Sequence, residues 1–158
     1  MRIGVFAGSF CPVTLGHVDS IEKAAKLVDK LYVVVGVNAS KSYSIPHDKR
    51  LDMLKRAISH VKNAEAVAID GMMTDFCKQV GATVMIKSIR NALDLQSVID
   101  LCDINDNYWD GETVFVVGSK QYRHVSSSLV RELAGLGQDF LEYVPTCCVE
   151  EIKKYLVK

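Results

Sequence analysis

The hydrophobic positions of this chain follow two spacings that alternate along its length. In residues 31–37 (LYVVVGV), β-branched and other apolar side chains stand at consecutive positions, which suits a parallel strand that is covered on both faces. Leu51, Leu54, Ile58 and Val61 instead recur every three or four positions, as on one face of a helix. The whole pattern predicts strands at residues 2–6, 31–37, 64–69, 83–86 and 113–117.

Helical segments separate each predicted strand from the next. Pro46 and Asp48 are typical of a helix start, and Gly81, Gly135 and Gly137 are typical of helix ends. The predicted helices follow His17 and Pro46, span residues 74–80 and 92–107, and follow Ser128 and Pro145. Along one side of the helix at 92–107 we expect Leu95, Val98, Ile99, Cys102 and Asn105.

Strands that alternate with helices pair in parallel through right-handed crossovers. We therefore predict an α/β fold, a doubly wound five-stranded parallel sheet of the Rossmann-like type. Because the sequence contains no repeat, low-complexity segment or linker, residues 1–158 are expected to form a single domain. Ligands of such sheets bind beyond the carboxyl ends of the strands. The polar candidates at those ends are Ser9, His17, Lys41, Lys87, Arg90, Ser126, Ser127 and Ser128.

The stretch from Ser9 to His17 indicates a chemistry. Small residues let the backbone turn directly after the first predicted strand, and Thr14 and Gly16 stand where the next helix begins. Unpaired N–H groups and the positive dipole end of that helix would form an anion site, with phosphate as the expected anion. His17 adds a side chain that can donate a hydrogen bond to a phosphoryl oxygen. A histidine at a helix start can also be a simple helix cap. The choice between capping and phosphate binding therefore depends on the residues around His17.

The charge balance argues against partners that are bound through net charge. The 158 residues include 19 basic and 19 acidic side chains, so the formal net charge is zero. We expect neither nucleic acid nor a membrane as a partner, because no apolar run is long enough for a membrane span and no signal-peptide core is present. The five cysteines lack the paired spacing of a zinc site, and we interpret them as reduced thiols of a cytoplasmic protein.

Several motifs make the chain similar to the phosphopantetheine adenylyltransferases over almost its whole length. The similarity begins with Gly8-Ser9-Phe10 and Pro12 and with Thr14-Leu15-Gly16-His17, which resembles the T/HxGH element of the nucleotidyltransferase superfamily. It continues through Ser40-Lys41, Gly71-Met72-Met73-Thr74-Asp75-Phe76, Ile86-Lys87-Ser88-Ile89-Arg90 and Val125-Ser126-Ser127-Ser128-Leu129-Val130-Arg131-Glu132. Each motif is weak alone, and their shared order and spacing make the resemblance specific.

The resemblance implies transfer of AMP from ATP to 4'-phosphopantetheine, which yields dephospho-coenzyme A and pyrophosphate. A phosphate oxygen of the acceptor, already ionised at neutral pH, would attack the α-phosphorus in line, so the protein would align the reactants and stabilise charge. Mg²⁺ is expected with ATP, held largely by phosphates and water. The family also implies a homo-oligomer, namely a hexamer built from trimers.

Roles for single residues are implied by the same resemblance. The catalytic residues would be His17, Lys41 and Arg90. The acceptor would contact Ser9, Lys41, Met73, Lys87 and Asn105. ATP would contact Gly8, Ser9, Phe10, His17, Arg90, Ser126, Ser127, Ser128 and Val130. No protein side chain is predicted to hold the metal.

The chain departs from the family pattern at a few positions. Cys11 stands where the family commonly has Asp, and Lys87 stands where it usually has Arg, which keeps the charge and loses the bidentate fork. Ser97 and Val98 replace a Tyr and a Glu that lie around the adenine pocket and the contacts with neighbouring subunits in the family. These changes bear on metal handling and nucleotide preference more than on the basic chemistry.

Other functions fit the same residues. A related cytidylyltransferase or nicotinamide mononucleotide adenylyltransferase would share the phosphate-binding groups and use a different acceptor. A nucleotide-binding protein that has lost turnover would keep the ATP site, and Cys11 together with the altered acidic segment favours it.

Overall fold

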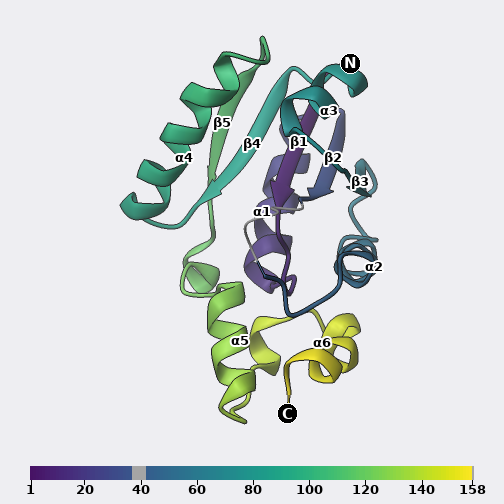
Figure 1. The fold of residues 1–158 in the computed structure, drawn as a ribbon, viewed down its shortest axis with the longest axis vertical. Coiled ribbons are helices and arrows are strands. Elements are labelled where there is room, and N and C mark those ends of the chain that lie inside the picture. The colour runs from purple at the N-terminus through teal and green to yellow at the C-terminus, as the bar shows by residue number, and fades with distance from the viewer. Residues whose placement is uncertain (37–41, 158) are drawn as a thin grey trace.

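Five parallel strands form one sheet at the centre of the computed structural model, which describes residues 1–36 and 42–157 (Figure 1). The strands are β1 (Ile3–Gly8), β2 (Lys30–Val35), β3 (Ala64–Ala68), β4 (Val84–Ile89) and β5 (Glu112–Val117). Their order across the sheet is β3-β2-β1-β4-β5, and every neighbouring pair is parallel. This arrangement confirms the predicted fold class.

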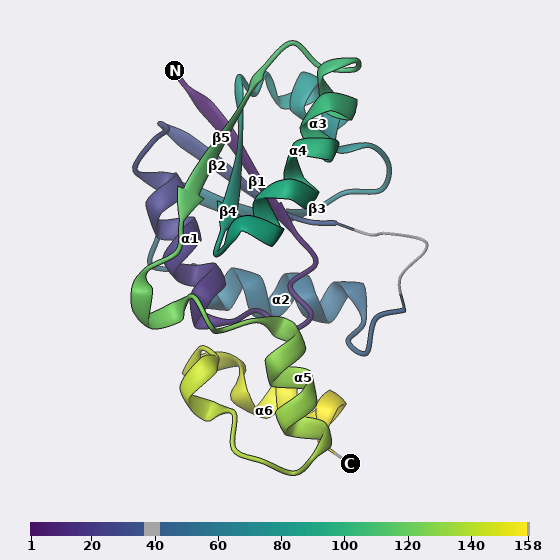
Figure 2. The same ribbon diagram turned by 90° about the vertical axis from the view of Figure 1, so that its left-hand side faces the viewer.

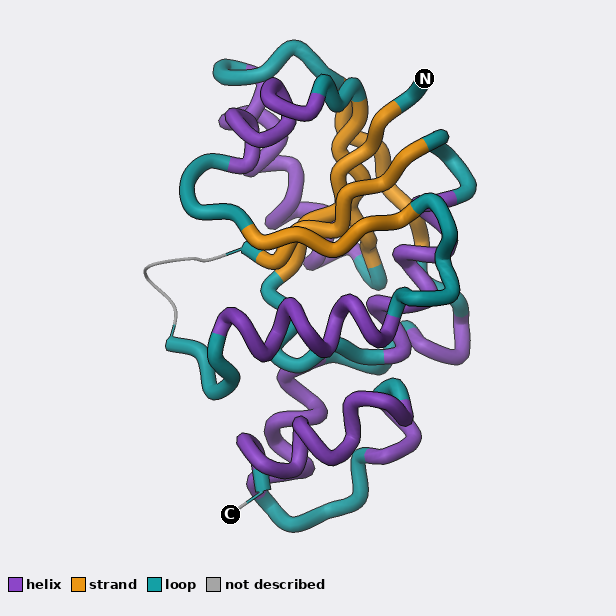
Figure 3. The backbone as a smooth tube through the Cα atoms, turned by 90° about the vertical axis from the view of Figure 1, so that its right-hand side faces the viewer, coloured by secondary structure: helices purple, strands orange, loops and turns teal. Residues whose placement is uncertain are grey.

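Helices cover both faces of the sheet (Figure 2). They are α1 (Leu15–Ala25), α2 (His47–Ala57), α3 (Met73–Val80), α4 (Ala92–Asp106), α5 (Ser127–Gly135) and α6 (Val149–Leu156). The helices α1 and α2 pack on one face, and α3 and α4 pack on the other. The helices α5 and α6 pack against each other beyond the strand layer, at the end of the molecule opposite the N-terminus (Figure 3).

Consecutive apolar residues in the strands supply two separate hydrophobic clusters. In β1, Phe6 belongs to the larger cluster beneath α1 and α2, whereas its neighbour Val5 belongs to the cluster that also contains Cys77 of α3 and Trp109. Successive side chains of a strand point to opposite faces, so a strand covered on both sides needs an unbroken apolar run. This explains why the strand pattern could be recognised in the sequence.

The strand β4 is longer than predicted, because Lys87 and Ser88 continue the ladder opposite Phe115 and Val116 of β5. Polar residues in a sequence usually mark the end of a strand. Here Lys87 and Ser88 lie within the strand, near its carboxyl end, where polar side chains can line the ligand crevice. The extension matters for the site, since it fixes which face of the sheet each of the two side chains takes.

The helix α4 corrects one prediction about packing. Leu95, Val98, Cys102 and Asn105 are partly buried along one side, as expected, but Ile99 is 40% exposed. No residue of α4 is fully buried, because the helix lies over the edge of the sheet formed by β4 and β5 (Figure 1).

None of the helices in the described part of the chain is long and apolar enough to cross a membrane. All five cysteines are free thiols.

Candidate functional site at the strand ends

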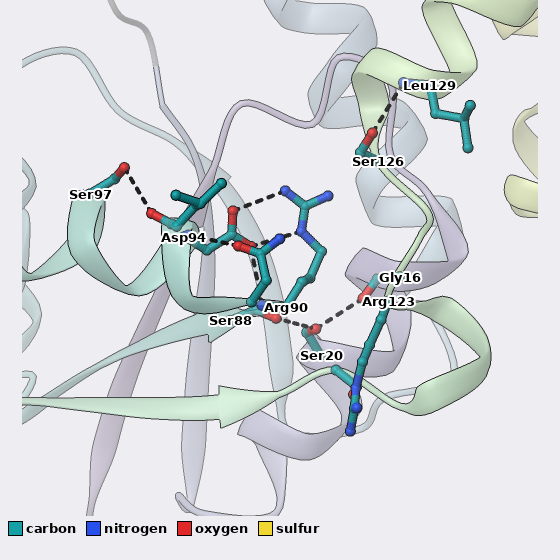
Figure 4. A network of polar contacts seen from close by, with 12 residues as sticks. Gly16, Ser20, Ser88, Arg90, Asp94, Ser97, Arg123, Ser126 and Leu129 are labelled. Carbon is teal, nitrogen blue, oxygen red and sulfur yellow. Dashed lines mark hydrogen bonds and ion pairs between the residues drawn. The ribbon is translucent and has the colours of Figure 1, made fainter.

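A cavity of about 490 Å³ opens at the carboxyl ends of β1 and β4, beside the first turns of α1 and α5. We call it the strand-end cavity. Its walls come from chain segments that are far apart in sequence: the turn after β1, the start of α1, the end of β4 and the N-terminal half of α4, and residues 118–128. Figure 4 shows the polar contacts along these walls. A sheet of this strand order places its ligand-binding crevice at this edge.

Most residues singled out from the sequence line this one cavity. They are Gly8, Ser9, Phe10, His17, Lys87, Arg90, Ser126, Ser127 and Ser128. Met73 and Asn105 lie outside its lining, near the second hydrophobic cluster, where the Asn105 amide is 3.7 Å from the sulfur of Met85. Val130 is completely buried in the main core, so its side chain packs rather than faces the cavity. Lys41 lies outside the described residues.

The ring of His17 is held by the start of its own helix. Thr14 is the N-cap of α1, and its backbone N–H donates to Nδ1 of His17 at 3.1 Å, while the His17 N–H donates to the Thr14 hydroxyl at 3.3 Å. Because Nδ1 accepts this bond, the proton of the neutral ring resides on Nε2, away from the cap. The Phe10 and His17 rings pack in an edge-to-face arrangement, with centroids 5.0 Å apart. The geometry therefore presents a fixed N–H donor on the cavity wall.

The charge state of His17 follows from its surroundings. Burial, and then the positive charge of Arg90, lower the pKa of its imidazole to about 4. The ring is consequently neutral near pH 7, which agrees with Nδ1 acting as an acceptor. A neutral imidazole can donate one hydrogen bond to an oxyanion without bringing a charge that would need a counter-ion.

The lowered pKa of His17 predicts a loss of stability in mild acid. The unfolded chain, with an ordinary histidine pKa near 6.5, binds more protons than the folded chain between that value and about 4. The free energy of unfolding should therefore decrease as the pH is lowered through this window. Between about pH 7 and about pH 5 the contribution of His17 is about 2 kcal/mol.

Urea unfolding of the wild type and of His17→Asn, each at both pH values, isolates this contribution from that of other groups. The Asn side chain places an acceptor oxygen where Nδ1 stands and does not titrate, so the variant should lose about 2 kcal/mol less than the wild type. Equal losses in the two proteins would show that His17 is not neutralised by the fold.

Arg90 and Asp94 form a closed ion pair on the cavity wall (Figure 4). The Arg90 Nε donates to Oδ2 of Asp94 at 2.9 Å, its Nη2 donates to Oδ1 at 3.3 Å, and its backbone N–H also donates to Oδ2 at 3.1 Å. The two residues are four apart at the start of α4, where Asn91 is the N-cap. This fork holds the guanidinium in place and leaves other N–H donors of Arg90 for a ligand.

Lys87 brings a positive charge that no described side chain neutralises. It lines the cavity, lies on the α3–α4 face of β4, and forms no hydrogen bond or ion pair with a described residue. Burial lowers the pKa of its ammonium below the ordinary value. A desolvated ammonium without a partner among the described residues favours a bound anion, which would stabilise its charged form.

The first turn of α5 faces the cavity with backbone donors. The Ser126 hydroxyl caps the helix by accepting from the Leu129 N–H at 3.1 Å, and the Ser127 hydroxyl donates to the Pro12 carbonyl at 2.7 Å. The N–H groups of Ser127 and Ser128 form no hydrogen bond within the described residues. Contacts to an anion would thus come from these N–H groups and from the Ser128 hydroxyl. The Ser126 and Ser127 hydroxyls are already engaged in the contacts just described.

Sequence reasoning missed the polar contacts that set the cavity's width. The Ser20 hydroxyl donates to the Gly16 carbonyl at 3.0 Å and lies 2.7 Å from the Ser88 hydroxyl, so the start of α1 is tied to the end of β4 (Figure 4). Asp94 was also missed as the partner of Arg90. The spacing of four residues was a visible signal for Arg90 and Asp94, whereas no local signal joined Ser20 to Ser88.

A larger hollow of about 670 Å³ lies between α5 and α6, near Phe140 and Lys153. None of the described residues that the sequence singled out as site residues lines it. The chemistry-bearing residues gather in the strand-end cavity instead.

Comparison with known proteins agrees with the family resemblance of the sequence motifs. Residues 5–133 match the family model described as cytidylyltransferase-like. A phosphopantetheine adenylyltransferase of Clavibacter michiganensis subsp. michiganensis is 39% identical over 155 residues, which cover 96% of this chain and 95% of that protein. A phosphopantetheine adenylyltransferase of Streptococcus pneumoniae is 41% identical over 154 residues, with coverage of 96% and 95%.

Solved structures with similar folds have far lower identity. A putative nicotinate-nucleotide adenylyltransferase of Vibrio parahaemolyticus matches with a TM-score of 0.69 and 15% identity, covering 99% of both chains. A nicotinic acid mononucleotide adenylyltransferase of Plasmodium falciparum matches with a TM-score of 0.68 and 14% identity, covering 98% of this chain and 95% of that chain. At such identity the likeness concerns the fold alone.

Proposed function

Since the chain belongs to the cytidylyltransferase-like family and, within it, to the phosphopantetheine adenylyltransferases, we propose that it transfers AMP from ATP to 4'-phosphopantetheine. The products are dephospho-coenzyme A and pyrophosphate, so the reaction is a step of coenzyme A biosynthesis. The observation that carries the proposal is the gathering of Ser9, His17, Arg90 and the α5 N-terminus in one cavity, on a chain that matches these enzymes over its length.

The chemistry asks for donors and alignment rather than for a base. The attacking group is a phosphate oxygen that is ionised at neutral pH, so no side chain has to remove a proton. The protein must hold the acceptor phosphate in line with the α-phosphorus and stabilise the charge that spreads over the oxygens in the transition state. The strand-end cavity offers neutral donors, cations and helix N–H groups for this task.

On the ATP side, Nε2–H of His17 would donate to an oxygen of the α-phosphoryl group as its charge develops. Arg90 would contact the triphosphate with the N–H groups that Asp94 leaves unused. The N–H groups of Ser127 and Ser128 would receive the outer phosphates. The turn formed by Gly8, Ser9 and Phe10, with residues 126–128, would border the adenylate, while Val130 would support this segment from the core.

On the acceptor side, the Ser9 hydroxyl and the Lys87 ammonium would hold the phosphate of phosphopantetheine. Lys41 would assist them, as the family resemblance implies. Met73 and Asn105 would contact the pantetheine arm, since they lie on the α3 and α4 side of the sheet, the face that also carries Lys87.

The magnesium ion expected with ATP suits the donor set of the cavity. The described residues contain no group of three or more His, Cys, Asp or Glu side chains placed to hold a metal, and Asp94 is the one carboxylate among the described residues that line the cavity. Such a set fits an ion held by phosphate oxygens and water, with Asp94 as the nearby carboxylate. When bound, Mg²⁺ neutralises phosphate charge; orientation remains the task of His17, Arg90 and α5.

We further propose that residues 1–158 act as one domain and that the chain works as a cytoplasmic homo-oligomer, a hexamer by family resemblance. The exposed apolar residues Leu93, Leu101, Ile104 and Tyr108 of α4 and its following turn support an interface on that helix. The five free thiols support a reducing compartment.

A substrate panel tests the function. Pyrophosphate release should require ATP and 4'-phosphopantetheine together, and should not occur with ATP and glycerol 3-phosphate or nicotinamide mononucleotide. Turnover with one of the other acceptors would assign a related transferase activity. Calorimetric binding of ATP without any product would instead favour the nucleotide-binding protein that has lost turnover.

A further inference from the structure

Arg50 of α2 is almost completely buried, at 1% exposure, and forms no ion pair with an acidic side chain in the described part of the chain. Its Nη1 donates to the carbonyl of Ser9 at 2.6 Å and to the carbonyl of Gly36 at 3.3 Å. Its guanidinium carbon stands 4.0 Å from the centroid of the Tyr43 ring, and its Nε has no hydrogen-bond partner among the described residues. Burying a cation without a carboxylate partner costs free energy, so we expect a function that offsets this cost.

The bond to Ser9 sets the direction of a peptide on the cavity wall. In a trans peptide the C=O and the following N–H point in opposite directions. Arg50 holds the Ser9 carbonyl from the α2 side, so the N–H of Phe10 points away from Arg50. Ser9 and Phe10 both line the strand-end cavity, and the Phe10 N–H forms no hydrogen bond within the described residues.

The same peptide leads into an unusual backbone conformation. Phe10 has a φ of +47°, in the left-handed region that bulky L-residues rarely adopt. Its ring is buried and packs roughly perpendicular to the ring of His17. Arg50 therefore holds the carbonyl directly before Phe10, whose backbone conformation needs stabilisation by other parts of the fold. Phe10 in turn contacts the His17 ring.

We propose that Arg50 is a positioning residue for phosphate binding in the strand-end cavity. It holds the Ser9–Phe10 peptide so that the Ser9 hydroxyl and the Phe10 N–H face a bound phosphate group, and it places a positive charge behind them. The inference rests on the proposed function for the identity of that phosphate. Arg50 itself would not touch the substrate and would act through the Ser9–Phe10 peptide.

Arg50→Met tests the proposal, because methionine keeps much of the apolar stem and removes the charge and the donors. Calorimetry with inorganic pyrophosphate should show affinity weakened about tenfold or more, as for the loss of hydrogen bonds from a charged group. In turnover assays the KM values for acceptor and ATP, measured separately, should rise more than kcat falls. Arg50→Lys, which keeps the charge with a shorter reach and no fork, should weaken pyrophosphate binding about threefold or more, yet less than Arg50→Met does.

Arg56→Met is the matched control. Arg56 lies on the same helix, and its Nη1 also donates to a backbone carbonyl, that of Cys147 at 2.7 Å, away from the cavity. This variant should bind pyrophosphate as the wild type does. Thermal unfolding of all variants separates a change of affinity from a loss of fold.

A folded Arg50→Met protein with wild-type affinity for pyrophosphate would overturn the proposal. If Arg50→Met does not fold, Arg50→Lys decides, and wild-type affinity in that variant also overturns it. The outcome is separable from that of the proposed function. Weaker pyrophosphate binding in a chain that never forms dephospho-coenzyme A would refute the function alone, and normal binding in an active enzyme would refute the role of Arg50 alone.

Discussion

Replacing His17 with alanine should lower kcat by about two to three powers of ten, the range for removing one donor to a developing oxyanion. The expectation follows from the N-cap geometry, in which Thr14 occupies Nδ1 and leaves Nε2–H as a fixed donor on the cavity wall. Since the pKa of the ring is lowered to about 4, this donor is present throughout the neutral range, and the titration of His17 should not affect kcat above about pH 6. Steady-state release of pyrophosphate measures the effect.

Two companion variants separate chemistry from folding. His17→Asn keeps an acceptor for the Thr14 N–H and lacks the Nε2 donor, so it should be as slow as His17→Ala while remaining more stable. His60→Ala is the control at a surface histidine, which pairs with Glu22 at 2.7 Å away from the cavity, and its kcat should equal that of the wild type. Wild-type turnover in a folded His17→Ala protein would remove His17 from the mechanism.

Replacing Arg90 with methionine should lower kcat/KM for ATP by about two powers of ten, which corresponds to about 3 kcal/mol for a charge-assisted bond to phosphate. The guanidinium is already oriented by Asp94, so little entropy is lost when the triphosphate binds. Loss of Arg90 would remove both the charge and the oriented donors. Initial rates at varied ATP, with the acceptor saturating, measure the change.

Asp94→Asn is the informative comparison for Arg90. It keeps the size of the side chain and removes the charge that orients the guanidinium, so kcat/KM for ATP should fall only a few fold, because Arg90 itself remains. An ATP dependence of Arg90→Met that matches the wild type would contradict the assigned contact. A larger loss in Asp94→Asn than in Arg90→Met would mean that the carboxylate, rather than the guanidinium, is the important group.

Much of the candidate site could be predicted because its residues stand where local rules operate. Thr14 begins α1 as a capping residue, and the Ser126 side chain caps α5, so both helix starts were visible as short polar motifs. The strand ends were visible as the ends of apolar runs. Parallel strands bring those ends to one edge, and so Ser9, His17, Lys87 and Arg90 were expected to lie near one another, as they do in the cavity lining.

Other features could not be predicted because no local pattern encodes them. Arg50 reads in the sequence as one more charge on an amphipathic helix, yet it is buried beneath the Ser9 turn. Ile99 belongs to the apolar pattern of α4 and is nevertheless exposed, because that helix covers only the sheet edge. Val130 sits within the serine motif that borders the cavity and points into the core.

Three features followed from residue patterns alone: the order of strands and helices, the two-sided burial of the sheet, and the positions of the helix N-termini and of the candidate phosphate-binding residues. These depend on residue spacing and on capping, which act within a few positions along the chain. The folded chain was needed to show the Ser20–Ser88 contact, the protonated nitrogen of His17 with its low pKa, and the buried contact of Arg50 with Ser9. Those depend on how the pleat, the helix packing and burial direct side chains from distant segments toward one another, and the linear pattern carries no record of that direction.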